Sequence, residues 1–339
     1  MSLNVLVTAA SRRVPLVRAF RKAVASIGGR VVVCDVNGLS PAVHVAHAAY
    51  KVPFSTDIDY LDAILDICRL ERIGLLVPTI DDEIPLFGST REHFEPLGVS
   101  VAASPEATAR LCNDKYTLCE RLRASGIAAA ESWLPGALPA DPTFPLFIKP
   151  RTGRGGVNAF PIRNQRELDF FLDYVPNPVV QEFLVGPEYT IDVLCGFDRI
   201  PRAIVPRSRV VIRSGVSDRG VTVADPTLVR LALDCTAALD FVGAVNIQCR
   251  VVNGKPTVFE INPRFSGGIP LTIAAGADFP KMLVDLVRGR EVPSAIGRFR
   301  PGLWMTNYEE SLYLDDAAIA ALQPIDESRV APAIGEQVA

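Results

Sequence analysis

The first hundred residues alternate between short apolar runs and longer amphipathic stretches. Residues 3–9 form an apolar run, and residues 14–27 follow with apolar positions at helical spacing. The same alternation predicts further strands at 30–35, 73–78 and 99–102 and helices at 57–72 and 84–94. Apolar strands separated by helices are typical of a parallel sheet covered on both faces, so we expect an α/β first domain.

Beyond residue 104 the pattern changes. Ser104-Pro105-Glu106 is a strong helix start, a second helix is expected over 115–125, and the Pro- and Ala-rich residues 133–145 predict a linker loop. Strands then dominate, at 146–150, 179–184, 188–194, 205–213, 244–251 and around 258–262, with one helix at 226–239.

A hairpin is predicted where Asn253-Gly254 joins the last two of these strands. It sets Gln248 near Glu260 and Asn262 across the ladder. Because side chains alternate along a strand, Glu260 and Asn262 point to the same face, about 7 Å apart.

The strand ending at Asn262 gathers several polar groups. Pro263 ends regular pairing, Arg264 follows, and Ser266-Gly267-Gly268 lets the backbone turn away. Carboxylate and amide oxygens suit Mg²⁺, and a guanidinium suits phosphate. The alternative is an edge strand with incidental polar residues.

A glycine-rich segment follows the strand that ends with Lys149. Gly153-Arg154-Gly155-Gly156 has three glycines in four residues, whose backbone amides can cover phosphate oxygens. It is not a P-loop, because neither Lys nor Ser follows the last glycine. A bare hairpin turn is the alternative, but Lys149 can reach the same phosphates and favours phosphate binding.

The first domain offers weaker candidates. A dinucleotide site is not predicted, because the turn after the first strand contains no glycine, and Asp35 is then a polar residue at a strand end. Asp82 and Glu83 follow a strand end where open α/β sheets bind ligands, and they are equally suited to begin a helix. In the second domain Arg207, Arg209 and Arg213 share one strand face, which is either solvated or contacts an anionic substrate.

Composition narrows the class of partner. A net charge of -3 over 339 residues gives no basic footprint for nucleic acid or an anionic membrane. Seven scattered cysteines predict reduced, buried thiols, and His44 with His47 lacks the further ligands of a zinc site. No apolar run is long enough for a signal peptide or a membrane span, so we expect a cytoplasmic protein.

In this order the segments resemble the ATP-grasp superfamily, and most of all the branch of biotin carboxylase and the carbamoyl-phosphate synthase large subunit, with its small stand-alone ligases. The resemblance covers about residues 1–290. It implies a Rossmann-like, parallel-sheet pre-ATP-grasp domain (1–107) followed by an α+β, two-lobed ATP-grasp domain (108–292). Within the latter it implies a flap lobe over about 115–182 and a large lobe over about 183–292, with residues 293–339 as a C-terminal extension.

The resemblance also implies residue roles. Lys115 and Lys149 would hold the nucleotide phosphates under the flap of Gly153, Arg154, Gly155 and Gly156. Adenine would bind at Gln181, Glu182, Phe183 and Leu184, and the ribose at Glu188. Gln248, Glu260 and Asn262 would hold two Mg²⁺ ions, with Mn²⁺ as an alternative, and Arg264 would stabilise the transferring phosphoryl group. Many members have Glu at the position of Gln248, whereas the synthetase branch has Gln, and this neutral ligand makes the first metal site less negative. Further substrate contacts are proposed at Asp82, Glu83, Arg207, Arg209, Arg213, Ser266 and Gly267.

The implied function is an ATP- and Mg²⁺-dependent carboxylate–amine ligase that forms a C–N bond through an acyl phosphate of a small carboxylic or amino acid. Its partners would be small molecules, without nucleic acid or membrane, and a homodimer is compatible with this. One alternative is a carboxylase or carboxylate kinase of the carbamoyl-phosphate synthase type. Another is a nucleotide-binding module without catalysis. An argument against this module is the presence together of Lys149, Glu260, Asn262 and Arg264.

Overall fold

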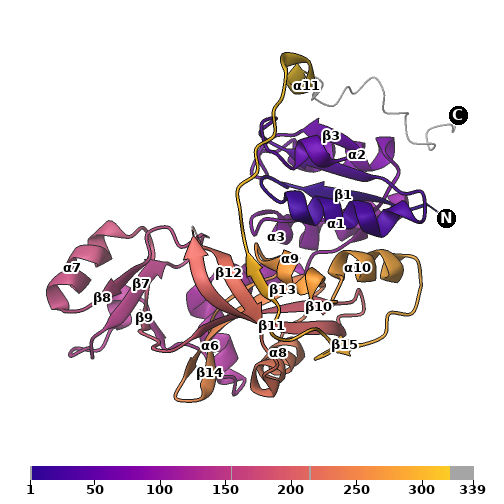
Figure 1. Cartoon of the computed structure of the whole chain (residues 1–339). Helices are drawn as coiled ribbons and strands as arrows, with labels where there is room; N and C mark the ends of the chain where they lie inside the picture. Colours follow the sequence, from indigo (N-terminus) through magenta and orange to yellow (C-terminus); the bar gives the residue numbers. More distant parts are fainter. Residues whose placement is uncertain (1, 154, 214, 321–339) are drawn as a thin grey trace, which may run out of the picture. The chain divides into compact units, whose positions relative to one another are not determined.

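The computed structural model describes residues 2–153, 155–213 and 215–320, which divide into two compact units (Figure 1). The first unit comprises residues 2–102, 280–291 and 309–320. The second comprises residues 103–279 and 292–308. Each unit has its own sheet or sheets, and the candidate residues divide between them.

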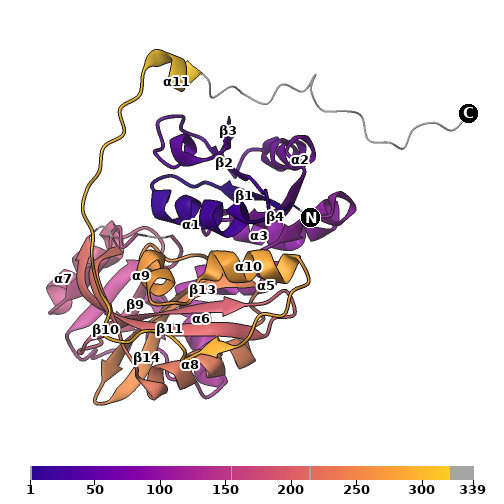
Figure 2. The ribbon, with the colours of Figure 1, turned by 45° about the vertical axis from the view of Figure 1, so that its right-hand side comes forward.

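The first unit is built on a parallel five-stranded sheet in the order β3-β2-β1-β4-β5. Its strands are β1 Asn4–Thr8, β2 Val31–Asp35, β3 Ala48–Lys51, β4 Ile73–Val77 and β5 Ser100–Val101. Helix α1 (Val14–Ala25) and helix α2 (Tyr60–Leu70) lie on opposite faces of the sheet (Figure 2), as right-handed crossovers require when the strand order reverses at β1. The predicted parallel sheet covered on both faces is confirmed.

Two helix predictions need correction. The helix expected over 84–94 is two helices, α3 (Glu83–Ser89) and α4 (Arg91–Phe94), because Thr90 leaves the helical conformation at φ -107° and ψ 20°. Ser104 was expected to cap the next helix, α5 (Glu106–Asn113). Its hydroxyl instead accepts a hydrogen bond from the backbone amide of Val242 at 3.2 Å, and Pro105 occupies the N-cap position.

The second unit contains a large, mainly antiparallel sheet in the order β14-β13-β10-β11-β12-β16, with β15 pairing in parallel with β11. Its strands are β10 Glu188–Cys195, β11 Pro201–Arg213, β12 Val216–Thr222, β13 Gly243–Val252, β14 Lys255–Asn262, β15 Ala295–Ile296 and β16 Trp304–Thr306. Helix α8 (Pro226–Ala238) packs against β10 and β11, while α5 and α6 (Lys115–Ala124) pack against β14. These contacts bury a continuous apolar core that holds one face of the sheet in place.

A smaller antiparallel sheet in the same unit has the order β6-β9-β7-β8. Its strands are β6 Ser132–Trp133, β7 Leu146–Pro150, β8 Phe160–Ile162 and β9 Pro178–Glu182, and helix α7 (Gln165–Tyr174) packs on it. Its own apolar cluster includes Leu146, Ile148, Leu168 and Val180. Part of the predicted linker over 133–145 therefore belongs to an ordered lobe, since β6 starts it and a 3-10 turn occupies Pro135–Ala137.

The predicted hairpin is confirmed, with Asn253 at φ 51° and Gly254 at φ 78° between β13 and β14. Residues 307–315 form no helix or strand, and the strand in this region is β16, which pairs with β12. The remaining elements are α9 (Ile269–Ala274), α10 (Phe279–Val287), α11 (Asp316–Ala320) and 3-10 turns at Val43–Val45 and Glu95–Leu97.

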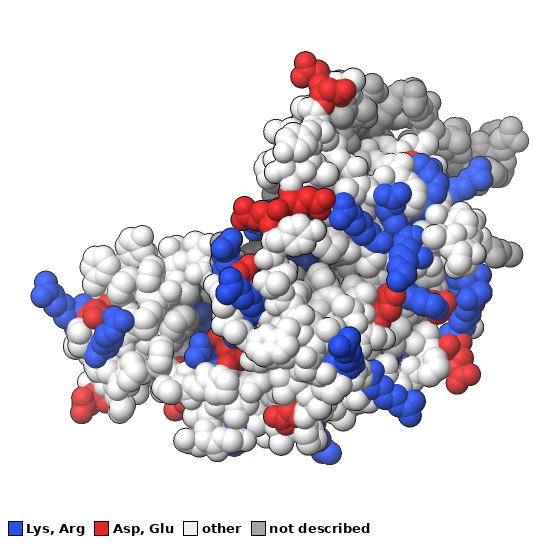
Figure 3. Space-filling model, viewed as in Figure 1, with Lys and Arg blue, Asp and Glu red and all other residues white. Residues whose placement is uncertain are grey.

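Among the described helices, none combines the length and the hydropathy needed to span a bilayer. On the face drawn in Figure 3, acidic and basic side chains of the second unit lie in small neighbouring groups.

Candidate active site

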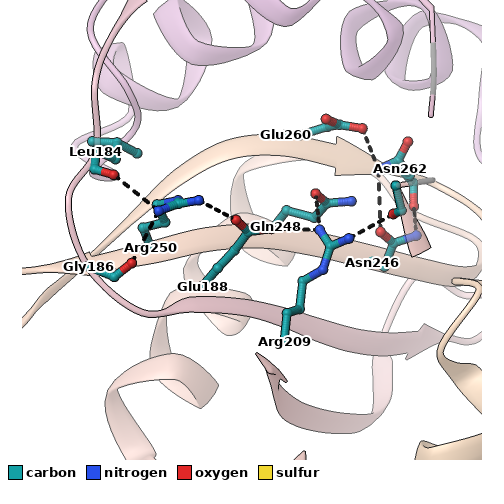
Figure 4. A network of polar contacts seen from close by, with 10 residues as sticks. Leu184, Gly186, Glu188, Arg209, Asn246, Gln248, Arg250, Glu260 and Asn262 are labelled. Carbon is teal, nitrogen blue, oxygen red and sulfur yellow. Dashed lines mark hydrogen bonds and ion pairs between the residues drawn. The ribbon is translucent and has the colours of Figure 1, made fainter. Parts of the chain in front are cut away.

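The candidate site is built on one polar face of the β13–β14 hairpin (Figure 4). Glu260 pairs with Gln248, and Asn262 pairs with Asn246. Asn262 Nδ2 donates to Glu260 Oε1 at 2.9 Å, so these two side chains share a face as the strand period predicts. The hairpin, with a register shift between Gln248 and Cys249, therefore brings the three proposed metal ligands onto neighbouring positions of two strands.

Asn246 is a site residue that sequence reasoning missed. Its buried Nδ2 donates to the carbonyl oxygens of Asn262 at 3.2 Å and Arg264 at 3.1 Å. These bonds fix the chain just where Pro263 stops the ladder and so orient Arg264. The signal was the alternation along β13, because Asn246, Gln248 and Arg250 occupy every second position on one face.

A β-bulge places Lys149 at this hairpin. The register shifts between Gln248 and Cys249, so that Phe259 is the extra residue on β14. Lys149 Nζ donates to the carbonyl oxygen of Phe259 at 3.2 Å and lies 5.3 Å from the centre of its ring. The ammonium group from the small sheet thus reaches the residue directly before Glu260.

The charges of this cluster shift one another's pKa values. Burial lowers the pKa of Lys149, with Lys115 adding to the effect, while Glu260 opposes it. Burial would raise the pKa of Glu260, but Lys149, Lys115, the Asn262 amide and Arg264 together hold it below its usual range. Glu260 is therefore ionised at neutral pH in a half-buried, cation-rich position.

The glycine segment lies beside the second lysine. Lys115 begins α6, and its Nζ donates to the carbonyl oxygen of Gly153 at 2.7 Å. Gly153 and Gly155 have φ values of 106° and 77°, a backbone conformation that favours glycine. Arg151 supports the segment through a bidentate contact with Asp114, with Arg151 Nη2 to Asp114 Oδ2 at 2.6 Å. Arg154 lies outside the described residues, and Gly156 also has a positive φ, of 67°.

The residues proposed for adenine lie at the end of β9 and beyond it. The buried side chain of Gln181 donates to Ser132 Oγ at 2.9 Å, and Glu182 Oε1 accepts from the amide of Glu131 at 2.9 Å. The ring of Phe183 lies 6.4 Å from that of Phe147. The carbonyl oxygen of Leu184 accepts a hydrogen bond from Arg250 at 3.4 Å. These contacts connect the small sheet to β13 of the large one.

Glu188 lies between two arginines. Its Oε1 accepts from Arg209 Nη1 at 2.7 Å, and its Oε2 accepts from Arg250 Nη2 at 2.7 Å. Arg209 Nη1 also donates to Gln248 Oε1 at 3.0 Å. A continuous polar network therefore runs from the position proposed for ribose to the position proposed for metal (Figure 4).

The three arginines of β11 do not share one environment, so a uniformly solvated face is ruled out. Arg207 is 1% exposed and forms a bidentate ion pair with Asp192, at 2.7 and 3.1 Å. Arg207 Nη2 also donates to Ser266 Oγ at 3.0 Å, which ties the turn after Arg264 to the sheet. Arg213 and Gly267 are exposed. Arg207 therefore supports the loop that follows the strand of the proposed metal ligands.

Asp82 and Glu83 belong to the first unit. Asp82 occupies the N-cap position of α3, without a side-chain capping bond. Glu83 is fully buried, accepts hydrogen bonds from Tyr60 and from Thr8 Oγ1, and its pKa is raised by burial to about 7. In the same unit the carboxylate of Asp35 accepts hydrogen bonds from the backbone amides of Ser11 at 2.8 Å and Asn37 at 3.0 Å. These bonds hold the loops that follow β1 and β2, so the role of Asp35 is structural.

Two family models match the chain. Residues 5–102 match the model described as PylC-like, N-terminal domain, and residues 175–311 match ATP-grasp in the biosynthetic pathway with Ter operon. The carbamoyl phosphate synthase large chain of Thermus thermophilus is 26% identical over 259 residues, covering 68% of this chain and 24% of that protein. The chain spans 16% to 24% of the length of such curated relatives.

Solved structures share the fold at low identity. The biotin carboxylase domain of the Hydrogenobacter thermophilus 2-oxoglutarate carboxylase, solved with MgADP, ADP and bicarbonate, is 17% identical with a TM-score of 0.68. The alignment covers 89% of this chain and 73% of that one. The L-amino acid ligase of Bacillus licheniformis is 17% identical with a TM-score of 0.66, covering 88% and 77%. The fold class predicted from the sequence is thereby confirmed.

Proposed function

We propose that this chain, in which a PylC-like N-terminal domain is followed by an ATP-grasp domain, is an ATP- and Mg²⁺-dependent carboxylate–amine ligase. It would activate a small carboxylic or amino acid as an acyl phosphate and join it to an amine. The observation that carries the proposal is the approach of Lys149 to the strand end of Glu260, where Arg264 also acts on the carboxylate. This combination suits a polyphosphate bound together with a divalent cation.

The nucleotide is held by groups from both sheets of the second unit. Lys115 and Lys149 bind the phosphates, and the glycine segment beside Lys115 covers them with backbone amides. The segment from Glu182 to Leu184 receives adenine through its backbone. Glu188 receives the ribose hydroxyls on the carboxylate lone pairs that its two arginines leave available.

The donor set at the hairpin fits Mg²⁺. Glu260 is ionised, with its pKa below the usual range, and Asn262 adds an amide oxygen on the same strand face. Hard oxygen donors of this kind are the ligands that Mg²⁺ selects over softer metals. When bound, the ion neutralises charge on the phosphate oxygens.

In the first step a carboxylate oxygen of the substrate attacks the γ-phosphorus in line. The bond to the bridging oxygen breaks, and ADP leaves with the electron pair. Lys149 and Arg264 stabilise the charge on the transferring group. The amine nitrogen then attacks the acyl carbon, the bond to phosphate breaks, and a proton leaves the nitrogen. The glycine segment excludes water that would hydrolyse the acyl phosphate.

A test uses ADP release by the purified full-length chain over a panel of amino acids and other small carboxylates, each with and without amines. A ligase releases ADP with an acid and yields an amide only when the amine is added. A carboxylate kinase or carboxylase turns over without an amine and forms no amide. Glu260→Ala should abolish turnover with an unchanged circular dichroism spectrum, and retained activity would refute the assignment.

A further inference from the structure

Arg209 occupies a fixed position between two groups of the nucleotide site. Its Nη1 lies 2.7 Å from Glu188 Oε1 and 3.0 Å from Gln248 Oε1. Its Nη2 donates to the carbonyl oxygen of Gly215 at 2.7 Å. The side chain is only 5% exposed, so these bonds hold the guanidinium in one place beside Gln248 (Figure 4).

The surrounding charges leave this position positive. Arg250 Nη2 binds the other oxygen of Glu188 at 2.7 Å, so two guanidinium groups share one carboxylate. Gln248 is neutral and adds no compensating charge. Glu260, the strand partner of Gln248, also attracts Arg209, but this one carboxylate is shared with Lys149, Lys115 and Arg264.

We propose that this chain binds a nucleoside triphosphate with one divalent ion instead of two, and that the guanidinium of Arg209 supplies the positive charge that a second ion would bring beside Gln248. The inference rests on the proposed function. The resemblance implies two metal ions, and this proposal replaces one of them. It also gives Arg209 an electrostatic role in place of the substrate contact proposed from the sequence.

The argument is electrostatic. Gln248 Oε1 has a second lone pair, so the hydrogen bond from Arg209 alone does not block a metal. A divalent ion on that oxygen would, however, lie next to a buried guanidinium, where repulsion is weakly screened. A Glu at this position would offset the repulsion, and Gln does not. Glu260 and Asn262 remain as ligands for a single ion.

Metal stoichiometry tests this without relying on activity. Mn²⁺ is titrated into the full-length chain saturated with the non-hydrolysable analogue AMP-PNP, and bound Mn²⁺ is counted by electron paramagnetic resonance. Wild type should bind one Mn²⁺ per bound nucleotide. Arg209→Met keeps an apolar stem without the charge and should bind a second ion at least about tenfold more tightly than wild type, a gain of about 1.4 kcal/mol. Arg230→Met is the matched control, because Arg230 is 76% exposed on α8, and it should behave as wild type.

The outcomes separate the two proposals. Two tightly bound Mn²⁺ ions in wild type would overturn the single-ion inference while leaving the ligase proposal in place. One ion in both wild type and a folded Arg209→Met variant would overturn the role of Arg209. Failure of the wild-type chain to bind AMP-PNP would contradict the proposed function, and the single-ion inference, which rests on it, would then be contradicted as well. The wild-type count decides the number of ions even if the variant does not fold.

Discussion

Lys149 Nζ lies 3.2 Å from the carbonyl oxygen of Phe259, the residue that a bulge inserts directly before Glu260. The extra residue leaves the regular ladder, so its carbonyl is available to an ammonium group from another sheet. One backbone irregularity thus fixes the distance between a lysine of the small sheet and a carboxylate of the large one.

Lys149→Met should abolish most activity without unfolding the chain. Burial lowers the pKa of Lys149, which means that burying its charge destabilises the folded chain. Met removes this unfavourable contribution, which offsets the loss of the hydrogen bond to Phe259, about 1 kcal/mol. Loss of a cation at the transferring phosphate should reduce ADP formation about 100-fold or more. Steady-state kinetics and urea unfolding measure the two effects. Lys255→Met, at the exposed start of β14, should leave both unchanged. Equal activity of the two variants would contradict the role of Lys149.

Glu83 should make the stability of the chain depend on pH. Burial raises its pKa to about 7, above the ordinary value of 4.5, so the folded chain holds a proton that the unfolded chain releases. Its contribution is therefore full below about pH 4.5, falls as the pH rises, and is lost above about 7, a total of about 3 kcal/mol. Glu83→Gln should remove this slope, as measured by urea unfolding at pH 5 and pH 7.5. An unchanged difference between the two pH values would show that Glu83 does not titrate in this range.

Gly268 should be required for stability because the side chain of Arg207 occupies the space where a Cβ would lie. Its φ of -93° suits any residue, but a Cβ would lie 2.4 Å from Arg207 Nη1 and 2.9 Å from its Cζ. Gly268→Ala must therefore displace a buried arginine from Asp192, at a cost of about 3 kcal/mol in the free energy of unfolding. Gly254→Ala, where φ is 78° and no atom lies within 4 Å, should cost only about 1 kcal/mol. Urea unfolding compares them, and equal losses would show that the Arg207 contact is unimportant.

The sequence predicted what depends on local pattern. Alternation along β14 was sufficient to set Glu260 and Asn262 on one face, and Asn253-Gly254 was sufficient to predict the hairpin. A regular ladder from that turn would set Gln248 opposite Phe259, and it is the bulge that moves Glu260 into this place. Helix α7 was missed although Asn164 caps it by accepting the amide of Glu167 at 3.0 Å, a signal that is present in the sequence.

Other features depend on contacts between distant segments. The bulge at Phe259 accompanies a bridge between Ala129 and Val258, which no property of β14 alone indicates. The burial of Arg207 depends on Asp192 on the adjacent strand and on Ser266, which is 59 residues away. Sequence periodicity placed Arg207 on a strand face but gave no information on what covers that face.

The acyl phosphate is the central claim, and isotope transfer tests it most directly. A carboxylate that supports ADP release is labelled with ¹⁸O in both oxygens and incubated with ATP, Mg²⁺ and amine. The released phosphate is then analysed by ³¹P nuclear magnetic resonance. Attack of the carboxylate on the γ-phosphorus predicts one ¹⁸O atom in each phosphate formed. Amide formation with phosphate that contains no ¹⁸O would contradict the mechanism.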